Sequence, residues 1–123
     1  MPTVAVVGAS TDRSKYGNKA VRAYVRQGYT VYPVNPNAST VEGLRAYRSV
    51  LDIPGPVDRV SLYLPPEVGK TVIRDIATKK PKEFYVNPGA ESDELFALAQ
   101  QHGLQPILAC SIVALGEDPQ SFS

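Results

Sequence analysis

An apolar, β-branched run that stops at a glycine opens the chain. Residues 3–7 read Thr-Val-Ala-Val-Val and end at Gly8, after which the polar residues 9–17 lead into a helical pattern. Such a run is typical of a buried strand, and glycine permits a sharp turn at its end. A strand, a glycine loop and a helix start with unpaired N–H groups form the anion-binding corner of doubly wound α/β folds. We therefore expect a ligand site beside Gly8.

Strand-like and helix-like segments alternate along the rest of the chain. The pattern predicts strands over residues 3–7, 29–34, 59–64, 83–86 and 106–110, with a short edge strand at 44–47. It predicts helices over residues 18–26, from Pro66 to about residue 77, and from the N-cap Ser92 to Gly103. Continuous apolar strands separated by helices favour a parallel sheet covered on both faces. We predict a Rossmann-like, doubly wound α/β fold with a mostly parallel sheet of five to six strands, formed by residues 1–123 as one domain.

Charge and composition narrow the classes of function. The formal net charge is +1, which gives no basic field for nucleic acid. No apolar run approaches the length of a membrane span, and the N-terminus lacks the pattern of a signal peptide. A single cysteine and a single histidine offer neither a disulfide nor a metal cluster. We expect a cytoplasmic protein with no metal site and no catalytic dyad.

Each predicted strand finishes, at its carboxyl end, in glycine, proline or a small polar residue. In open α/β sheets the ligand lies beyond these ends, so they supply most of the candidate binding residues. The polar loop after Gly8 adds cations that could hold phosphate, as do Arg45 and Arg48. The candidate binding residues are Gly8, Ala9, Ser10, Arg13, Lys15, Gly17, Asn18, Val34, Asn35, Pro36, Leu64, Pro65, Asn87 and Gly89.

For two of these candidates a structural role fits the sequence as well as a ligand contact does. Asn18 is as suitable for a helix cap as for a ligand contact. Asn35 can hold its own turn through its side chain or contact a nucleotide.

The dinucleotide fingerprint G-x-G-x-x-G is absent, since the next glycine after Gly8 is Gly17. A site for NAD also needs an acid at the end of the second strand, and this chain has Asn35 there. The pattern therefore disfavours NAD. It does not disfavour a phosphorylated adenosine, which a carboxylate would repel.

Several stretches follow the pattern of one family, namely residues 6–10, 28–36, 42–43, 47–54, 57–58, 65–67, 87–89, 91, 103–104 and 110. With them the chain resembles the small single-domain CoA-binding proteins, which are related to the N-terminal domain of the succinyl-CoA synthetase α subunit. The resemblance implies that residues 8–10 hold the CoA pyrophosphate, that residues 34–36 lie along the adenosine, and that residues 64–66 close the other side. The chain departs from the family in residue type at three places: Asn37 stands where a lysine is common, Leu64 stands where many relatives have arginine, and residues 87–89 replace a glutamine-containing strand end.

From this resemblance we expect a protein that binds CoA or an acyl-CoA without catalysis of its own, as a carrier, sensor or partner subunit. Two alternatives stay open: an enzyme that uses NAD(P) or another nucleotide, and an interaction domain whose nucleotide site has decayed. Whether the chain forms a homodimer or has another protein partner is also open. We expect His102 to lie at the C-terminus of a helix, where a cation interacts favourably with the helix dipole. Cys110 is interpreted as a packed thiol or as one that meets the CoA thiol at the rim.

Overall fold

Five parallel strands form the sheet on which the structure of residues 1–123, a computed structural model, is built. The strands are β1 (Thr3–Val7), β2 (Thr30–Val34), β5 (Arg59–Leu62), β6 (Glu83–Val86) and β7 (Pro106–Leu108), in the order β2-β1-β5-β6-β7. All four pairings are parallel. The predicted fold class is confirmed. The strand order reverses between β1 and β5, and doubly wound sheets open a crevice at such a point.

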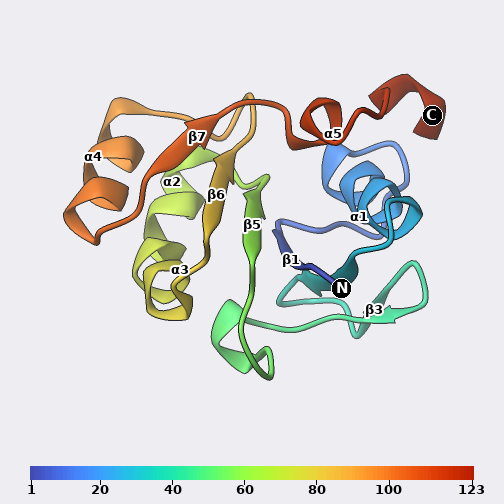
Figure 1. Ribbon diagram of the computed structural model, residues 1–123, viewed down its shortest axis with the longest axis horizontal. Helices are drawn as coiled ribbons and strands as arrows, with labels where there is room; N and C mark the ends of the chain where they lie inside the picture. Colours follow the sequence, from blue (N-terminus) through green and yellow to red (C-terminus); the bar gives the residue numbers. More distant parts are fainter.

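Helices cover both faces of the sheet (Figure 1). Helices α1 (Tyr16–Arg26) and α5 (Ser111–Ala114) lie on one face. The other face carries α2 (Pro66–Gly69), the 3-10 turn η2 (Lys70–Val72), α3 (Ile73–Lys79) and α4 (Asp93–Gln101). Because side chains alternate along a strand, Val4 and Val6 of β1 join the core under α1, while Ala5 and Val7 join the core on the other face.

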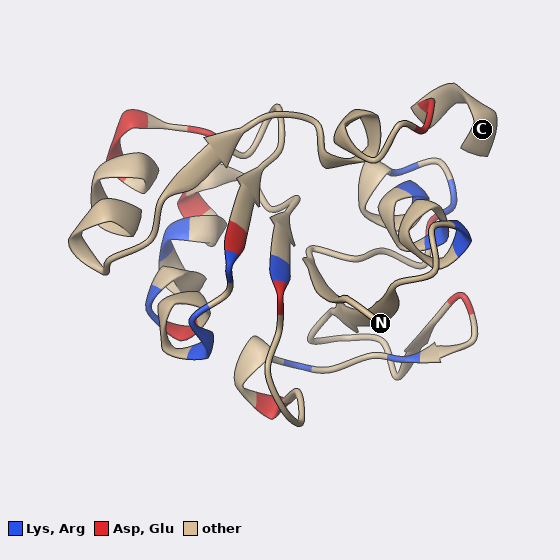
Figure 2. Ribbon diagram, in the orientation of Figure 1, with Lys and Arg blue, Asp and Glu red and all other residues tan.

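Charged residues in the sheet are confined to the starts of β5 and β6, at Arg59 and Glu83 (Figure 2). These two side chains form an ion pair at 2.8 Å. Charges at the carboxyl ends of the strands must therefore come from the loops that follow them.

Pro33 fits into β2 because β2 lies at the edge of the sheet. Its carbonyl oxygen accepts a hydrogen bond from the amide of Tyr47, on the side away from β1. The ring nitrogen faces the same side, so β2 loses no hydrogen bond to β1. Edge positions are where strands tolerate proline.

The helix predicted from Pro66 to about residue 77 is broken into α2, η2 and α3. The hydroxyl of Thr71 donates to the carbonyl of Val68 at 2.6 Å and so competes with the regular helical bond. Gly69 packs against the side chains of Leu62 and Leu95 at the same break. The apolar spacing that predicted one helix is satisfied by three short pieces on the same face.

The other differences from the predicted elements are local. Helix α1 begins two residues before the predicted Asn18, β2 begins at Thr30, and β5 and β7 end two residues early. The predicted edge strand at 44–47 is divided: β4 (Leu44–Arg45) pairs with β3 (Thr40–Val41) in a separate hairpin, and Tyr47 forms an isolated parallel bridge to Val34 at the edge of the sheet. The 3-10 turns η1 (Val50–Asp52) and η3 (Pro119–Phe122) and the helix α5 were not predicted.

The ends of α4 follow the sequence signals. The Ser92 hydroxyl accepts a hydrogen bond from the Leu95 amide at 3.0 Å, as an N-cap does. His102 is the C-cap, and Gly103 follows with a φ of 83°.

Cys110 is half-buried and stands at the N-cap of α5. No helix of the structure has the length and apolar character needed to cross a membrane.

Candidate functional site

Two glycines let the start of α1 pack directly on the loop after β1. Gly8 has a φ of 95°, and a Cβ there would lie 3.0 Å from the carbonyl carbon of Tyr63. A Cβ at Gly17 would overlap the carbonyl oxygen of Gly8. Gly17 therefore permits the close approach of helix and loop that the last glycine of a dinucleotide fingerprint permits elsewhere.

Some backbone amides of this loop are paired and others are free. The amides of Gly8 and Ala9 both donate to the Val34 carbonyl at 3.2 Å. The amides of Ser10, Tyr16 and Gly17 donate to no acceptor within the protein. Lys15, the N-cap of α1, makes no capping hydrogen bond with its side chain. Free amides at the start of an eleven-residue helix favour an anion.

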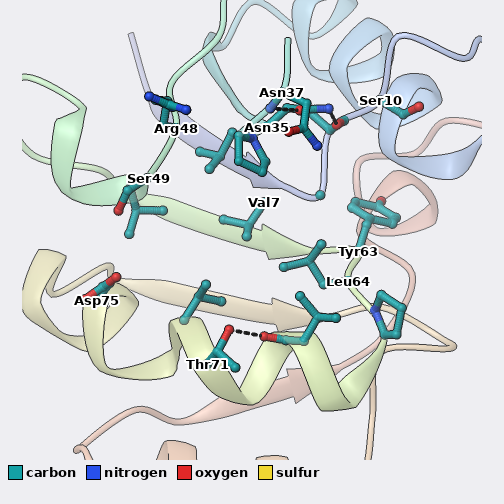
Figure 3. A pocket seen from close by; sticks show the side chains of 18 of the residues that line it. Val7, Ser10, Asn35, Asn37, Arg48, Ser49, Tyr63, Leu64, Thr71 and Asp75 are labelled. Atoms are coloured by element: carbon teal, nitrogen blue, oxygen red, sulfur yellow. Dashed lines mark hydrogen bonds between the residues drawn. The ribbon is translucent and has the colours of Figure 1, made fainter.

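A cavity of about 630 Å³ opens beside this loop, at the carboxyl ends of β1, β2 and β5. Figure 3 shows Ser10 and Tyr63 toward one end of it and Arg48, Ser49 and Asp75 toward the other. A volume of this size is within the range of small-molecule sites. Its lining residues come from the ends of β1 and β2, from the loops that follow β1, β2, β4 and β5, from η1 and from the broken helix: Val7, Gly8, Ala9, Ser10, Lys15, Val34, Asn35, Pro36, Asn37, Arg48, Ser49, Val50, Tyr63, Leu64, Pro65, Val68, Thr71, Val72 and Asp75.

Two cations and one carboxylate line this cavity, and none of the three is in an ion pair. Lys15 and Arg48 are exposed on the side of β1 and β2, and Asp75 belongs to α3. By contrast, Arg13 pairs with Glu42 at 3.4 Å, and Arg45 stacks on the ring of Tyr47 at 5.1 Å. Of the four cations that the sequence indicated for phosphate, Lys15 and Arg48 are thus the two that the fold leaves available at the cavity.

A second, smaller cavity of about 320 Å³ adjoins the first. Gly8, Lys15, Tyr63 and Pro65 line both. The other lining residues of the second cavity are Tyr16, Gly17, Pro88, Gly89 and Ala90.

The structure brings most of the predicted site residues together. Those that line the larger cavity are Gly8, Ala9, Ser10, Lys15, Val34, Asn35, Pro36, Leu64 and Pro65. Gly17 and Gly89 line only the smaller cavity. Arg13, Asn18 and Asn87 line neither.

Asn18 and Asn87 are both fully enclosed, and their amide groups are used inside the protein. Asn18 donates to the carbonyl of Ser10 at 2.9 Å and to Glu42 at 3.0 Å. Asn87 donates to Ser61 at 2.9 Å and accepts from the amide of Ser111 at 2.8 Å. Neither side chain is therefore available to a ligand in this arrangement.

Asn35 lines the larger cavity but also holds its own turn. Its Oδ1 accepts hydrogen bonds from the amides of Asn37 and Ala38 at 2.7 and 3.1 Å. Its Nδ2 donates to the carbonyl of Ala9 at 2.9 Å. The side chain thus ties the loop after β2 to the loop after β1.

Tyr63 stands between the two cavities, and a buried polar network holds it there. Its hydroxyl lies 3.2 Å from Ser111 Oγ, which is 2.7 Å from Ser61 Oγ. Burial raises the pKa of the Tyr63 hydroxyl above its ordinary value, although hydrogen bonds with Ser111 and Ser61 act to lower it. Tyr63 is consequently a neutral hydroxyl at physiological pH.

One wall of the larger cavity is formed by residues that the sequence did not indicate as binding residues. Val68, Thr71, Val72 and Asp75 recur at three- and four-residue spacing after Pro65. That spacing marks one helical face, and none of its four residues was among the predicted binding residues. Val68 is 48% exposed, so it is not part of the core. The one sequence signal that could have placed this face at the ligand site is its position directly after the end of a strand.

Comparison with known proteins identifies a family. A family model described as a CoA binding domain matches residues 2–116. The α subunit of the ADP-forming acetate–CoA ligase II of Pyrococcus furiosus is 32% identical over 117 residues, which cover 85% of this chain and 25% of that subunit. The ADP-forming acetate–CoA ligase II of Archaeoglobus fulgidus is 31% identical over 115 residues, which cover 84% of this chain and 17% of the ligase. The chain thus spans a quarter or less of these two relatives.

Solved structures agree with this assignment. A conserved hypothetical protein from Pyrococcus furiosus superposes with a TM-score of 0.84 and 35% sequence identity, covering 93% of this chain and 99% of the other. In that pair the shared fold extends over nearly the full length of both chains.

Proposed function

Because this chain belongs to the CoA-binding domain family, we propose that its larger cavity binds coenzyme A or an acyl-CoA. The observation that carries the proposal is that free amides and two unpaired cations belong to residues lining the larger cavity and the smaller one that adjoins it, at the point where the strand order reverses. Ligands of open α/β sheets bind at this point.

The proposed pyrophosphate position lies at the end of the cavity formed by the loop after β1. Ser10, whose amide is free, and Lys15 line this end, and the free amides of Tyr16 and Gly17 belong to residues that line the smaller cavity beside it. Since Gly8 and Ala9 already donate to Val34, we assign the amide contacts to Ser10 and the first residues of α1. A helix N-terminus stabilises a phosphate through these N–H groups and its dipole.

The proposed adenosine position runs along residues 34–37 toward Arg48. It passes Asn35, which stands where NAD-binding sites carry an acid that binds the ribose hydroxyls. The guanidinium of Arg48 is free of any ion pair and suits a phosphate on the ribose. Coenzyme A carries such a phosphate, and NAD does not.

The groups on the cavity wall are those of a binding site: amides, two cations, hydroxyls and apolar side chains. We propose that the protein binds CoA without catalysis of its own, as a carrier, a sensor or a partner subunit. The relatives that share this domain as a quarter or less of a larger ligase fit the role of partner subunit.

Charge reversal at the two cations should separate the two phosphate positions. We expect Lys15→Glu to weaken the binding of CoA and of dephospho-CoA alike, by at least about fivefold, since loss of one exposed charge contact costs up to about 1 kcal/mol and the new carboxylate also repels phosphate. We expect Arg48→Glu to weaken CoA by a similar factor and to leave dephospho-CoA almost unchanged. Isothermal titration calorimetry with both ligands measures the four affinities.

The matched control is Lys80→Glu, which makes the same charge change at an exposed residue outside both cavities. It should bind both ligands as the wild type does. Equal losses in all three variants would show that the variants act through net charge alone and that the phosphates lie elsewhere.

A further inference from the structure

Arg22 holds three separate parts of the protein with one guanidinium group. Its Nε donates to Asn18 Oδ1 at 2.8 Å. Its Nη2 donates to the carbonyl of Arg13 at 2.8 Å and to the carbonyl of Phe122 at 2.7 Å. The planar guanidinium presents its donors in a fixed geometry, so these contacts orient one another.

Asn18 extends this set of contacts to the loop after β1. Its side chain is fully buried, and Nδ2 donates to the carbonyl of Ser10 at 2.9 Å. The carbonyl of Ser10 is therefore held through Asn18, and the carbonyl of Arg13 is held by Arg22 itself. Both carbonyls belong to the segment of residues 10–15, whose residues Ser10 and Lys15 line the larger cavity.

Hydrogen bonds within residues 10–15 also shape this segment. Within it, the Asp12 carboxylate accepts from the amide and the hydroxyl of Ser14 at 3.0 and 2.7 Å, and the Lys15 amide donates to the Asp12 carbonyl at 3.1 Å. These local bonds shape the turn. The Lys15 carbonyl joins it to α1 through the amides of Asn18 and Lys19, and the side chains of Asn18 and Arg22 attach its earlier part, at Ser10 and Arg13.

Phe122 fixes Arg22 from the other side. Its ring is 4% exposed and lies under the guanidinium groups of Arg22 and Arg26, at 5.5 and 4.3 Å. Residues at the far end of the chain thus contribute to the position of a loop that begins at residue 8.

We propose that Arg22 is a positioning residue for the ligand loop: acting through Asn18 and the carbonyls of Ser10 and Arg13, it holds residues 10–15 in the conformation that binds phosphate. The inference rests on the proposed function, because it concerns the affinity of that same site. Arg22 lines neither cavity, so it acts on the ligand only through the loop.

The expected effect follows from the population of the competent loop. A ligand that binds one conformation loses apparent affinity in proportion to the fraction of protein in it. If loss of Arg22 lowers that fraction to about a tenth, the dissociation constant for CoA rises about tenfold.

Arg26 provides a matched control on the same helix. Its guanidinium also lies over Phe122 and pairs with Glu117 at 3.2 Å, but it makes no hydrogen bond or ion pair with residues 8–15. The test compares Arg22→Ala with Arg26→Ala in two measurements. Calorimetry gives the affinity for CoA, and amide hydrogen exchange gives the opening of the loop at Asp12, Ser14 and Lys15.

We expect Arg22→Ala to bind CoA about tenfold more weakly and to exchange these three amides faster, while Arg26→Ala matches the wild type in both. If Arg22→Ala does not fold, Arg22→Gln, which keeps most of the stem and loses the fork, replaces it. Equal affinity and equal loop exchange in the two alanine variants would overturn the proposal. Failure of the wild type to bind CoA would instead refute the proposed function, and the exchange comparison would still decide whether Arg22 holds the loop.

Discussion

Replacing Gly17 with alanine is expected to lower the free energy of unfolding by about 3 kcal/mol, at the upper end of the cost of overpacking, and to abolish CoA binding. The new methyl group would overlap the carbonyl oxygen of Gly8. That neighbour is backbone, so α1 and the loop must move apart, and the free amides of Ser10 and Gly17 would separate with them. Urea unfolding and calorimetric titration with CoA measure the two effects.

Gly69→Ala is the matched control, because Gly69 is also helical and also closely packed. Its added Cβ would lie 3.0 Å from Leu95 Cδ1 and 3.3 Å from Leu62 Cδ2, which are ends of flexible side chains. We expect a loss below about 1 kcal/mol there. A Gly17→Ala protein as stable as the Gly69→Ala protein, with CoA affinity intact, would show that the close approach of α1 to Gly8 is not required.

Replacing Asn87 with leucine is expected to cost about 3 kcal/mol of stability, because the buried amide of Ser111 loses its acceptor and the hydroxyl of Ser61 loses a donor. The leucine keeps a similar volume but supplies no polar atom. Since Ser111 also contacts the Tyr63 hydroxyl, the wall between the two cavities should loosen as well. Urea unfolding gives the free energy, and the exchange rate of the Ser111 amide reports the local loss.

Asn37→Leu makes the same chemical change at an exposed residue whose side chain makes no hydrogen bond. Its stability should stay within about 0.5 kcal/mol of the wild type. If the Asn87 and Asn37 variants unfold at the same urea concentration, the buried network does not stabilise the sheet ends.

The sequence predicts the fold here because its strongest signals are local. The run before Gly8 and the apolar run that contains Pro33 each identify a strand within a few residues. Glycine, proline and a capping serine mark where the elements end, and the local chemistry of these residues explains those boundaries. The break around Thr71 was not predictable from apolar spacing, because the apolar residues keep the same spacing through it.

The candidate site is less predictable than the fold because its residues meet only in three dimensions. The position of Gly8 at a strand end places the cavity, but the local sequence does not separate an exposed asparagine from a buried one. Asn35 and Asn37 reach the cavity, whereas Asn18 and Asn87 are enclosed by side chains distant in sequence. For the same reason no local pattern connects Arg22 with Phe122, one hundred residues away.

Isothermal titration of the wild-type protein with CoA, with NAD as the competing candidate, tests the central proposal most directly. We predict a dissociation constant for CoA in the micromolar range, which corresponds to about −8 kcal/mol, and no measurable binding of NAD, because the cavity has Asn35 in place of the ribose-binding acid. No heat with CoA at concentrations of hundreds of micromolar, together with clear binding of NAD, would contradict the account.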